Sequence, residues 1–167
     1  MNKYLKIIVV GCPGSGKSYF STELSKITNI PVYHLDIIGW KPNWVKTQRE
    51  ELQKLVGDIM IKSEWIIDGN YSGTMEDRFM NAEVVFFFDL PTEVCLQGAS
   101  ERIGKPRYGF PDYLDEKEDC EFLDYIRGFK ETNRLKIISL IEKYPDLKVI
   151  TFKSRDESNS YLNSLLK

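Results

Sequence analysis

Residues 11–18 of the chain read Gly11-Cys12-Pro13-Gly14-Ser15-Gly16-Lys17-Ser18, which is the pattern G-x-x-x-x-G-K-[ST]. Glycines permit the backbone of a tight turn, so that successive N–H groups converge on a polyphosphate at the start of a helix. The lysine of this pattern supplies a mobile cation for the β- and γ-phosphates, and its final hydroxyl is an oxygen ligand for Mg²⁺. We therefore predict that residues 11–18 bind a nucleoside triphosphate, with Lys17 acting in catalysis and Ser18 on the metal.

The segments around this loop predict strands that alternate with helices. Residues 4–10 are an apolar run typical of a buried strand, and Phe20, Leu24 and Ile27 recur at helical spacing behind the loop. Further apolar runs at 32–35, 65–67, 84–88 and 147–152 are separated by helical patterns. This order predicts an α/β fold of three layers, in which a five-stranded parallel sheet carries helices on both faces.

Length and composition predict one domain over residues 1–167, since 42% of the residues are hydrophobic and 29% are charged. The net charge of −2 does not favour direct binding to nucleic acids. No apolar stretch is long enough to span a membrane, so we expect a cytoplasmic protein. The three cysteines predict neither a disulfide framework nor a zinc site. Cys12 is either a reactive thiol or, as we favour, a small residue that fills a loop position.

Three carboxylates stand where predicted strands end, which is where parallel sheets bind ligands. Asp36 follows the second strand, and we expect it to orient and deprotonate the hydroxyl of an acceptor. Asp68 follows the third strand and is our choice for the magnesium side of the site, with Asp89 as the alternative. His34, the chain's one histidine, is expected to have a structural role rather than a catalytic one.

Residues 37–62 form the predicted acceptor-side region. Trp40 and Trp44 either stack on a planar acceptor or anchor a flap to the body of the protein. Residues 47–50 have the form of a capping box, which predicts that a helix begins there. Further along, Arg78 lies in a predicted short helix, where it either binds a phosphate of the acceptor or lies on the surface.

Residues 103–120 have no periodicity and contain four helix-breaking residues, namely Gly104, Pro106, Gly109 and Pro111. A long irregular segment with cations at its start is typical of a lid that closes over the transferring phosphate, although a solvated connector has a similar composition. We predict that Lys17 and Arg102 stabilise the charge that develops on the phosphoryl oxygens. Either Arg107 or Arg134, the latter from a long amphipathic helix over 122–141, would help them. An acidic run follows at 115–119.

With these features the chain resembles the P-loop nucleoside and nucleotide kinase superfamily, adenylate kinases included. It resembles more closely the DNA topology modulation, or FlaR-like, proteins. The motifs that carry the resemblance are GCPGSGKS, HLD with the following W-x-P-N-W, WIIDGNYSGTMEDRF and FFFDLP. The resemblance implies a five-stranded sheet, an ATP donor, a lid that includes Arg102, and phosphoryl transfer to a small acceptor. It places Asp36 on the acceptor side and Asp68 on the magnesium side.

Adenylate kinases carry D-G-F-P-R at the third strand, whereas this chain has Asp68-Gly69-Asn70-Tyr71-Ser72. The phosphate-binding arginine of that motif is missing here, which argues against AMP as the acceptor. The sequence therefore predicts a kinase that uses ATP and Mg²⁺ to phosphorylate a nucleotide, a nucleoside or another small hydroxylated molecule. The alternative is an ATP-binding regulatory module that hydrolyses ATP slowly or not at all and affects DNA topology indirectly. The sequence carries no signal for oligomeric state.

A GTPase switch is one form of the regulatory alternative, because Asp36-Ile37-Ile38-Gly39 fits the loose pattern D-x-x-G. No N-K-x-D motif, which would read a guanine base, follows a later strand. We therefore favour ATP over GTP. A DNA-acting protein is the third hypothesis, but it would need a basic surface stripe that the composition does not suggest.

Overall fold

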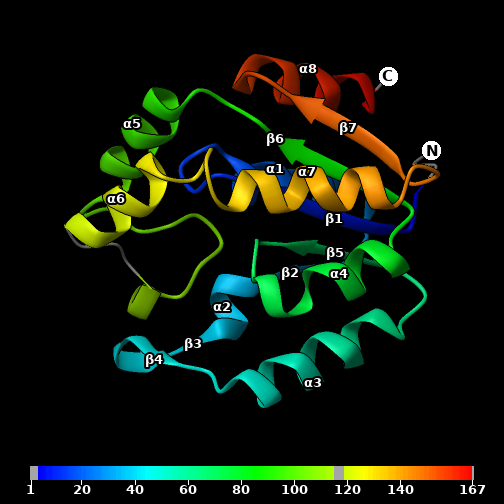
Figure 1. The fold of residues 1–167 in the computed structure, drawn as a ribbon, viewed down its shortest axis with the longest axis horizontal. Helices are drawn as coiled ribbons and strands as arrows, with labels where there is room; N and C mark the ends of the chain where they lie inside the picture. The colour runs from blue at the N-terminus through cyan, green and yellow to red at the C-terminus, as the bar shows by residue number, and fades with distance from the viewer. Residues whose placement is uncertain (1–3, 115–118, 167) are drawn as a thin grey trace.

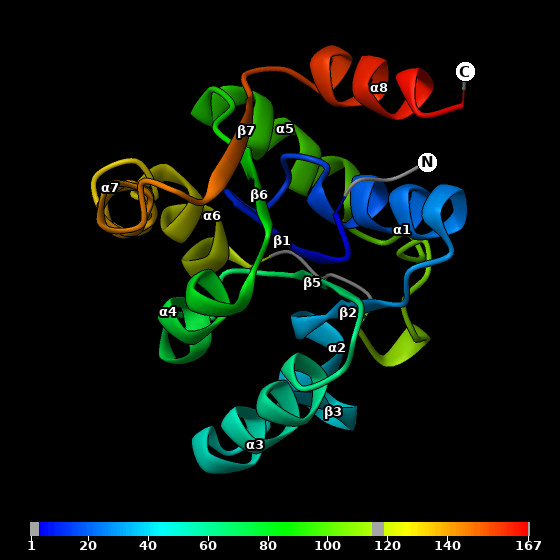
Figure 2. The ribbon, with the colours of Figure 1, turned by 90° about the vertical axis from the view of Figure 1, so that its right-hand side faces the viewer.

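The computed structural model describes residues 4–114 and 119–166. Its main sheet has five parallel strands in the order β2 (Val32–His34), β5 (Trp65–Asp68), β1 (Lys6–Gly11), β6 (Val84–Phe88) and β7 (Lys148–Phe152). Helices α1 (Lys17–Thr28) and α8 (Arg155–Ser164) cover one face, while α4 (Ser72–Asn81) and α7 (Asn133–Lys143) cover the other (Figures 1 and 2). The predicted three-layer α/β fold is confirmed.

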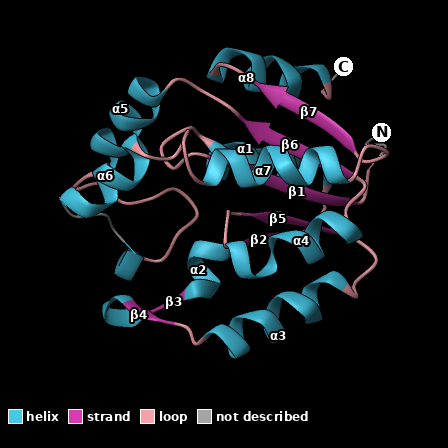
Figure 3. Ribbon diagram, in the orientation of Figure 1, coloured by secondary structure: helices cyan, strands magenta, loops and turns pink. Residues whose placement is uncertain are grey.

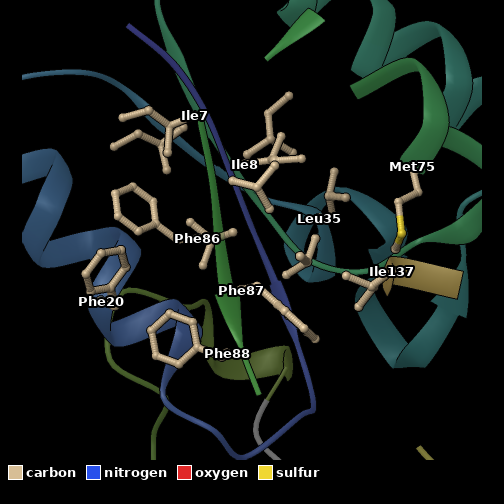
Figure 4. Close-up of a cluster of buried hydrophobic side chains, with 14 of the residues drawn as sticks. Ile7, Ile8, Phe20, Leu35, Met75, Phe86, Phe87, Phe88 and Ile137 are labelled. Atoms are coloured by element: carbon tan, nitrogen blue, oxygen red, sulfur yellow. The ribbon is translucent and has the colours of Figure 1, made fainter. Parts of the chain in front are cut away.

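The core lies on both faces of the central strands, because residues that alternate along a strand point to opposite sides of the sheet. On one side Phe20 of α1 packs against Phe86 and Phe88, with ring centroids 5.0 and 5.4 Å apart. On the other side Phe87 lies with Ile137 from α7 (Figure 4). All of these side chains are buried, which is why the parallel strands read as continuous apolar runs.

The remaining elements connect the strands (Figure 3). Between β2 and β5 the chain forms α2 (Leu35–Gly39), a small hairpin and α3 (Arg49–Met60), and the hairpin consists of β3 (Trp40–Lys41), the 3₁₀ turn η1 (Pro42–Trp44) and β4 (Val45–Lys46). After β6 come α5 (Thr92–Arg102), the 3₁₀ turn η2 (Asp112–Leu114) and α6 (Cys120–Arg127). None of the helices in the described residues is long and apolar enough to cross a membrane.

The structure corrects three details of the sequence interpretation. The single helix expected over 122–141 is two helices, because α6 ends at Arg127, before Gly128, and α7 starts only at Asn133. The second strand ends at His34, so that Asp36 lies in the first turn of α2. The capping box does not form, since the Thr47 hydroxyl donates to the carbonyl of Ile38 at 2.7 Å. Residues 115–118 of the predicted lid segment and its acidic run lie outside the described residues.

Candidate active site

The predicted phosphate-binding loop connects β1 to α1, and three of its glycines have positive φ angles. These are +140° at Gly11, +80° at Gly14 and +104° at Gly16, in the region that side chains disfavour. A β-carbon on Gly14 would also lie 2.0 Å from the carbonyl oxygen of Cys95 in α5. The loop can follow this path only with glycine at that position. Its amides face the start of α1, where the first N–H groups have no partner within the helix.

Residues from distant segments hold the loop in place. Asn70, two residues after β5, makes two hydrogen bonds to the backbone of Gly11. Its side-chain oxygen accepts from the Gly11 N–H at 3.0 Å, and its side-chain nitrogen donates to the Gly11 carbonyl at 2.8 Å. Arg155, the first residue of α8, donates to the carbonyl of Gly14 at 2.8 Å. The Lys17 ammonium group donates to the carbonyl of Cys12 at 3.1 Å and is almost fully buried. Contacts from within the protein therefore support the path of the loop.

The thiol of Cys12 is buried behind the loop. A hydrogen bond with the thiol of Cys95 and burial together raise the pKa of Cys12, while the charge of Lys17 opposes that shift. The thiol is thus protonated at neutral pH. This environment agrees with a residue that fills space in the loop rather than with a reactive thiolate.

Ser18 and Asp68 meet at the end of the sheet where we predicted a magnesium site. The Ser18 hydroxyl donates to Asp68 Oδ2 at 2.8 Å, and the other oxygen, Oδ1, is buried with no hydrogen-bond partner among the described residues. Burial alone would raise the pKa of Asp68. The pKa is nevertheless lowered overall, because the hydrogen bond and charge of His34, the charge of Lys17 and the hydrogen bond from Ser18 together outweigh burial. The carboxylate is thus ionised, and an ionised carboxylate with one oxygen that lacks a hydrogen-bond partner, beside a hydroxyl, fits Mg²⁺.

Across residues 4–114 and 119–166 there is no group of three or more His, Cys, Asp or Glu side chains that could hold a metal ion. In phosphate-binding loops the hydroxyl and the acidic residue supply only part of the magnesium shell. Phosphate oxygens and water supply the other ligands. Ser18 and Asp68 are therefore a sufficient protein contribution here.

Asp89 is the alternative metal residue, and the structure gives it other partners. Its two oxygens accept from the guanidinium of Arg134 at 2.7 and 2.9 Å, and Oδ2 also accepts from Lys153. Both oxygens of Asp89 are thus already bound to cations, which favours Asp68 as the metal residue. The same contacts correct the prediction for Arg134, because its guanidinium is bound to Asp89 at the end of β6.

Described residues of the predicted lid segment line a cavity together with the loop and contact the acceptor side. A cavity of about 490 Å³ is lined by Lys17 and Ser18 below and by Arg102, Arg107 and Phe110 opposite. The guanidinium of Arg107 lies 3.8 Å from the centre of the Phe110 ring and donates to Asp36 Oδ2 at 3.3 Å. Residues predicted to contact the phosphates therefore line one cavity, and Arg107 connects that cavity to Asp36 on the acceptor side.

The two predicted acceptor-binding tryptophans lie on the β3–β4 hairpin, which follows α2 and its Asp36. The rings of Trp40 and Trp44 pack edge to face with their centroids 5.4 Å apart. This contact lies within the hairpin itself, so anchoring of the hairpin to the body of the protein stays a prediction. Stacking of either ring on an acceptor stays a prediction.

Arg78 does not lie in the open site, which corrects both interpretations of it. The side chain is fully buried, and its guanidinium donates to the carbonyls of Gly69 at 2.7 Å, Asn70 at 2.8 Å and Tyr71 at 3.1 Å. Arg78 therefore fixes the turn after β5, the turn that carries Asn70. It is a structural residue of the site rather than a ligand-binding one.

Tyr71 is a residue near the site that sequence reasoning missed. A β-carbon on Gly39 would lie 2.0 Å from the Tyr71 hydroxyl, so this ring packs directly on the end of α2. Burial and the charge of Asp36 raise the pKa of Tyr71 to about 12. The phenol thus stays protonated beside Asp36 and can donate a hydrogen bond to an acceptor. Its place in the D-G-N-Y segment was the one available signal.

Solved structures with a similar fold include two shikimate kinases. The enzyme from Bacteroides thetaiotaomicron aligns with a TM-score of 0.56 and 19% sequence identity, over 97% of this chain and 96% of that chain. The enzyme from Aquifex aeolicus aligns with a TM-score of 0.55 and 19% identity, over 96% and 92% of the two chains. An uncharacterized protein from Eubacterium ventriosum aligns with a TM-score of 0.53 and 14% identity over 96% and 95%.

These alignments agree with the P-loop kinase-like fold that the sheet and the loop already define. At such identities they show the fold alone. No family model matches the chain, and no curated protein matches it either. The resemblance to the DNA topology modulation proteins therefore stays a prediction.

Proposed function

We propose that this protein is a kinase that transfers the γ-phosphoryl group of ATP to a hydroxyl group of a small molecule. The observation that carries the proposal is the single cavity bounded by Lys17 and Ser18 of the loop and by Arg102 and Arg107 of the opposite segment. Phosphoryl transfer requires mainly positioning and neutralisation of charge, and both sides of this cavity supply cations.

Each residue has a defined task in this proposal. The loop amides and Lys17 bind the β- and γ-phosphates, and Arg102 and Arg107 stabilise the charge on the phosphoryl oxygens during transfer. Asp36 accepts a hydrogen bond from the acceptor hydroxyl and takes its proton as the new P–O bond forms. Ser18 and Asp68 would hold Mg²⁺, which supplies neutralisation of the phosphate charges when it is bound.

The acceptor is proposed as a class, namely a nucleotide, a nucleoside or another small hydroxylated molecule. The burial of Arg78 removes the one arginine near the D-G-N-Y segment that was a candidate to replace the arginine of adenylate kinases. AMP is for this reason a weaker candidate than neutral hydroxylated molecules. Shikimate belongs among the compounds to test, because two structures with the same fold are named as shikimate kinases.

The test measures ADP release from ATP and Mg²⁺ with a panel of nucleosides, nucleotides, shikimate and simple polyols. A kinase shows release that depends on one class of acceptor, and a new phosphate ester should appear in the product. Lys17→Ala is the control and should lower turnover at least about 100-fold, since it removes a charge that stabilises the transferring group. ADP release that no acceptor stimulates would instead indicate the ATP-binding regulatory module.

A further inference from the structure

His34 ends β2 directly opposite Asp68 in β5, because the two residues are partners in the parallel register. Its Nδ1 atom lies 2.7 Å from Asp68 Oδ2, and both side chains are buried, with 6% and 3% of their surface exposed. A carboxylate only accepts hydrogen bonds, so Nδ1 carries a hydrogen toward Asp68. We propose that His34 is a positioning residue that orients Asp68 toward the metal side of the site and connects this carboxylate to the lid segment.

Two hydrogen bonds hold the carboxylate of Asp68 in one orientation. Asp68 Oδ2 accepts from His34 at 2.7 Å and from the Ser18 hydroxyl at 2.8 Å, so two donors fix the same oxygen. Rotation of the carboxylate would break both bonds. Oδ1 is therefore held in one place, buried and with no hydrogen-bond partner in the part of the chain that the structure describes. That oxygen is the one left for magnesium or for its water shell.

The imidazole of His34 also contacts helix α1. Its Nε2 atom lies 3.2 Å from the Thr22 hydroxyl oxygen, and that hydroxyl donates to the carbonyl of Ser18 at 2.8 Å. The Thr22 contact comes from the second turn of α1, the helix that begins at the phosphate loop. His34 thus has a hydrogen-bond partner on the neighbouring strand at Nδ1 and a polar contact with this helix at Nε2.

Phe110, from the described part of the predicted lid segment, packs against His34. The ring of Phe110 packs on the imidazole with centroids 4.8 Å apart, and the guanidinium of Arg107 covers the same phenyl ring. Arg107 in turn bonds Asp36 on the acceptor side. A movement of this segment therefore changes the packing on His34, and through His34 the support of Asp68. Groups that orient metal ligands from behind in this way contribute about 10- to 100-fold to metal affinity or activity.

This inference rests on the proposed function, since it presumes that Asp68 serves Mg²⁺ beside a bound nucleotide. A histidine that only packs in the core would contribute to stability but not to the magnesium dependence of nucleotide binding. The two roles therefore differ in a quantity that needs no turnover. It is the gain in affinity for an ATP analogue when Mg²⁺ is added.

The experiment is calorimetric titration of the full chain with an ATP analogue that cannot transfer its γ-phosphoryl group, with Mg²⁺ and with a chelator. The matched variants are His34→Asn and His34→Gln. The amide nitrogen of asparagine can occupy the place of Nδ1 and donate to Asp68, whereas that of glutamine reaches the place of Nε2. We expect His34→Gln to lower the magnesium-dependent gain about 10-fold and His34→Asn to keep it within about 3-fold. Affinity in the chelator should stay the same in all three proteins.

Equal gains in wild type and His34→Gln would overturn the proposal, and so would equal losses in His34→Asn and His34→Gln. Phe110→Ala tests the lid connection and should lower the gain about 3-fold, on the scale of such supporting contacts. An unchanged gain in Phe110→Ala would refute that connection. If the wild-type chain does not bind the analogue at all, the proposed function itself fails. That result is distinct from binding that His34→Gln leaves unaltered.

Discussion

The Ser18 hydroxyl donates a 2.8 Å hydrogen bond to the carboxylate of Asp68, although the two residues are 50 positions apart in the sequence. The bond joins the first turn of α1 to the end of β5, which pairs with β1 in the sheet. A residue of the predicted phosphate-binding loop is thus in contact with a carboxylate at a strand end. This contact separates the two candidates for the metal side, because Asp89 is bound to cations instead.

The first prediction compares Asp68→Asn with Asp89→Asn. Removing the charge of Asp68 should lower magnesium-dependent turnover at least about 100-fold, because one acidic contribution to the site is lost. Asp89→Asn is the control and should keep turnover within about 3-fold, since the bonds of Asp89 go to Arg134 and Lys153. Initial rates at several Mg²⁺ concentrations measure both. A larger loss in the Asp89 variant would reverse the assignment.

The second prediction concerns stability in acid. The pKa of Asp89 is lowered to about 2, mainly by the hydrogen bond from Arg134. Burial raises this pKa, but the hydrogen bonds and charges of Arg134 and Lys153 together outweigh burial. The unfolded chain has a higher pKa at this residue, about 3.9. The contribution of Asp89 to the free energy of unfolding is therefore complete above about pH 4 and is lost as the pH falls toward 2.

Because the partner cations are partly exposed, we expect that contribution to be about 1–2 kcal/mol. Urea unfolding at pH 7 and at pH 2.5 measures it in wild type and in Asp89→Asn. The difference in stability between the two proteins should shrink at the lower pH. A difference that stays constant between these pH values would contradict the assigned ion pair.

The third prediction concerns Arg78. Arg78→Met leaves the carbonyls of the turn after β5 without their charged donor, which should cost about 2–4 kcal/mol in the free energy of unfolding. Arg78→Lys keeps a cation but not the fork that reaches several carbonyls, so it should restore only part of this stability. Urea unfolding of the three proteins gives the values. If Arg78→Met kept full stability but bound the acceptor more weakly, Arg78 would be an acceptor-binding residue rather than a structural one.

The fold was predictable because its signals are local. Apolar strands, the loop pattern and the helical spacing of Phe20, Leu24 and Ile27 lie within short windows of sequence. The place of Asp68 could also be predicted, since the ends of parallel strands meet at one edge of a sheet. The break between α6 and α7 had one signal, Gly128, which the continuous hydrophobic spacing concealed.

The contacts of the site depend on pairings between distant segments and could not be predicted. His34 meets Asp68 because β2 pairs with β5 in one register, and the sequence of either strand alone does not specify that register. The hydrogen bonds of Arg78 go to backbone carbonyls, which every residue carries, so no sequence pattern marks its partners. Asn70 bonds the loop backbone for the same reason.

The fourth prediction compares two glycines with positive φ angles. Gly14→Ala and Gly104→Ala both impose backbone strain, of about 1–2 kcal/mol. Only at Gly14 would the new β-carbon meet the backbone of α5, whereas at Gly104 it would have no described atom within 4 Å. Gly14→Ala should therefore cost about 1–3 kcal/mol more. Thermal unfolding measures stability, and titration with ATP should show weaker binding for Gly14→Ala alone. Equal effects at both positions would mean that the close approach to Cys95 does not hold in solution.

The fifth prediction concerns Asp36, the proposed acceptor-side base. Asp36→Asn keeps the size of the side chain but removes the charge that binds Arg107 and takes the proton of the acceptor. Because the Asp36 side chain is 47% exposed, the lost ion pair should change the free energy of unfolding by less than about 1 kcal/mol. Loss of a general base should lower turnover of the acceptor about 100-fold or more.

Affinity for the unreactive ATP analogue should change no more than about 3-fold in this variant, because loop, lysine and magnesium side are intact. Arg107→Gln is its matched partner, since it breaks the same ion pair from the lid side. It should weaken analogue binding as well as turnover, because Arg107 lines the cavity in which we propose that the nucleotide binds. If turnover and analogue affinity fell by the same factor in Asp36→Asn, Asp36 would contact the nucleotide rather than the acceptor. The proposed role of Asp36 as the base that accepts the proton of the acceptor would then be wrong.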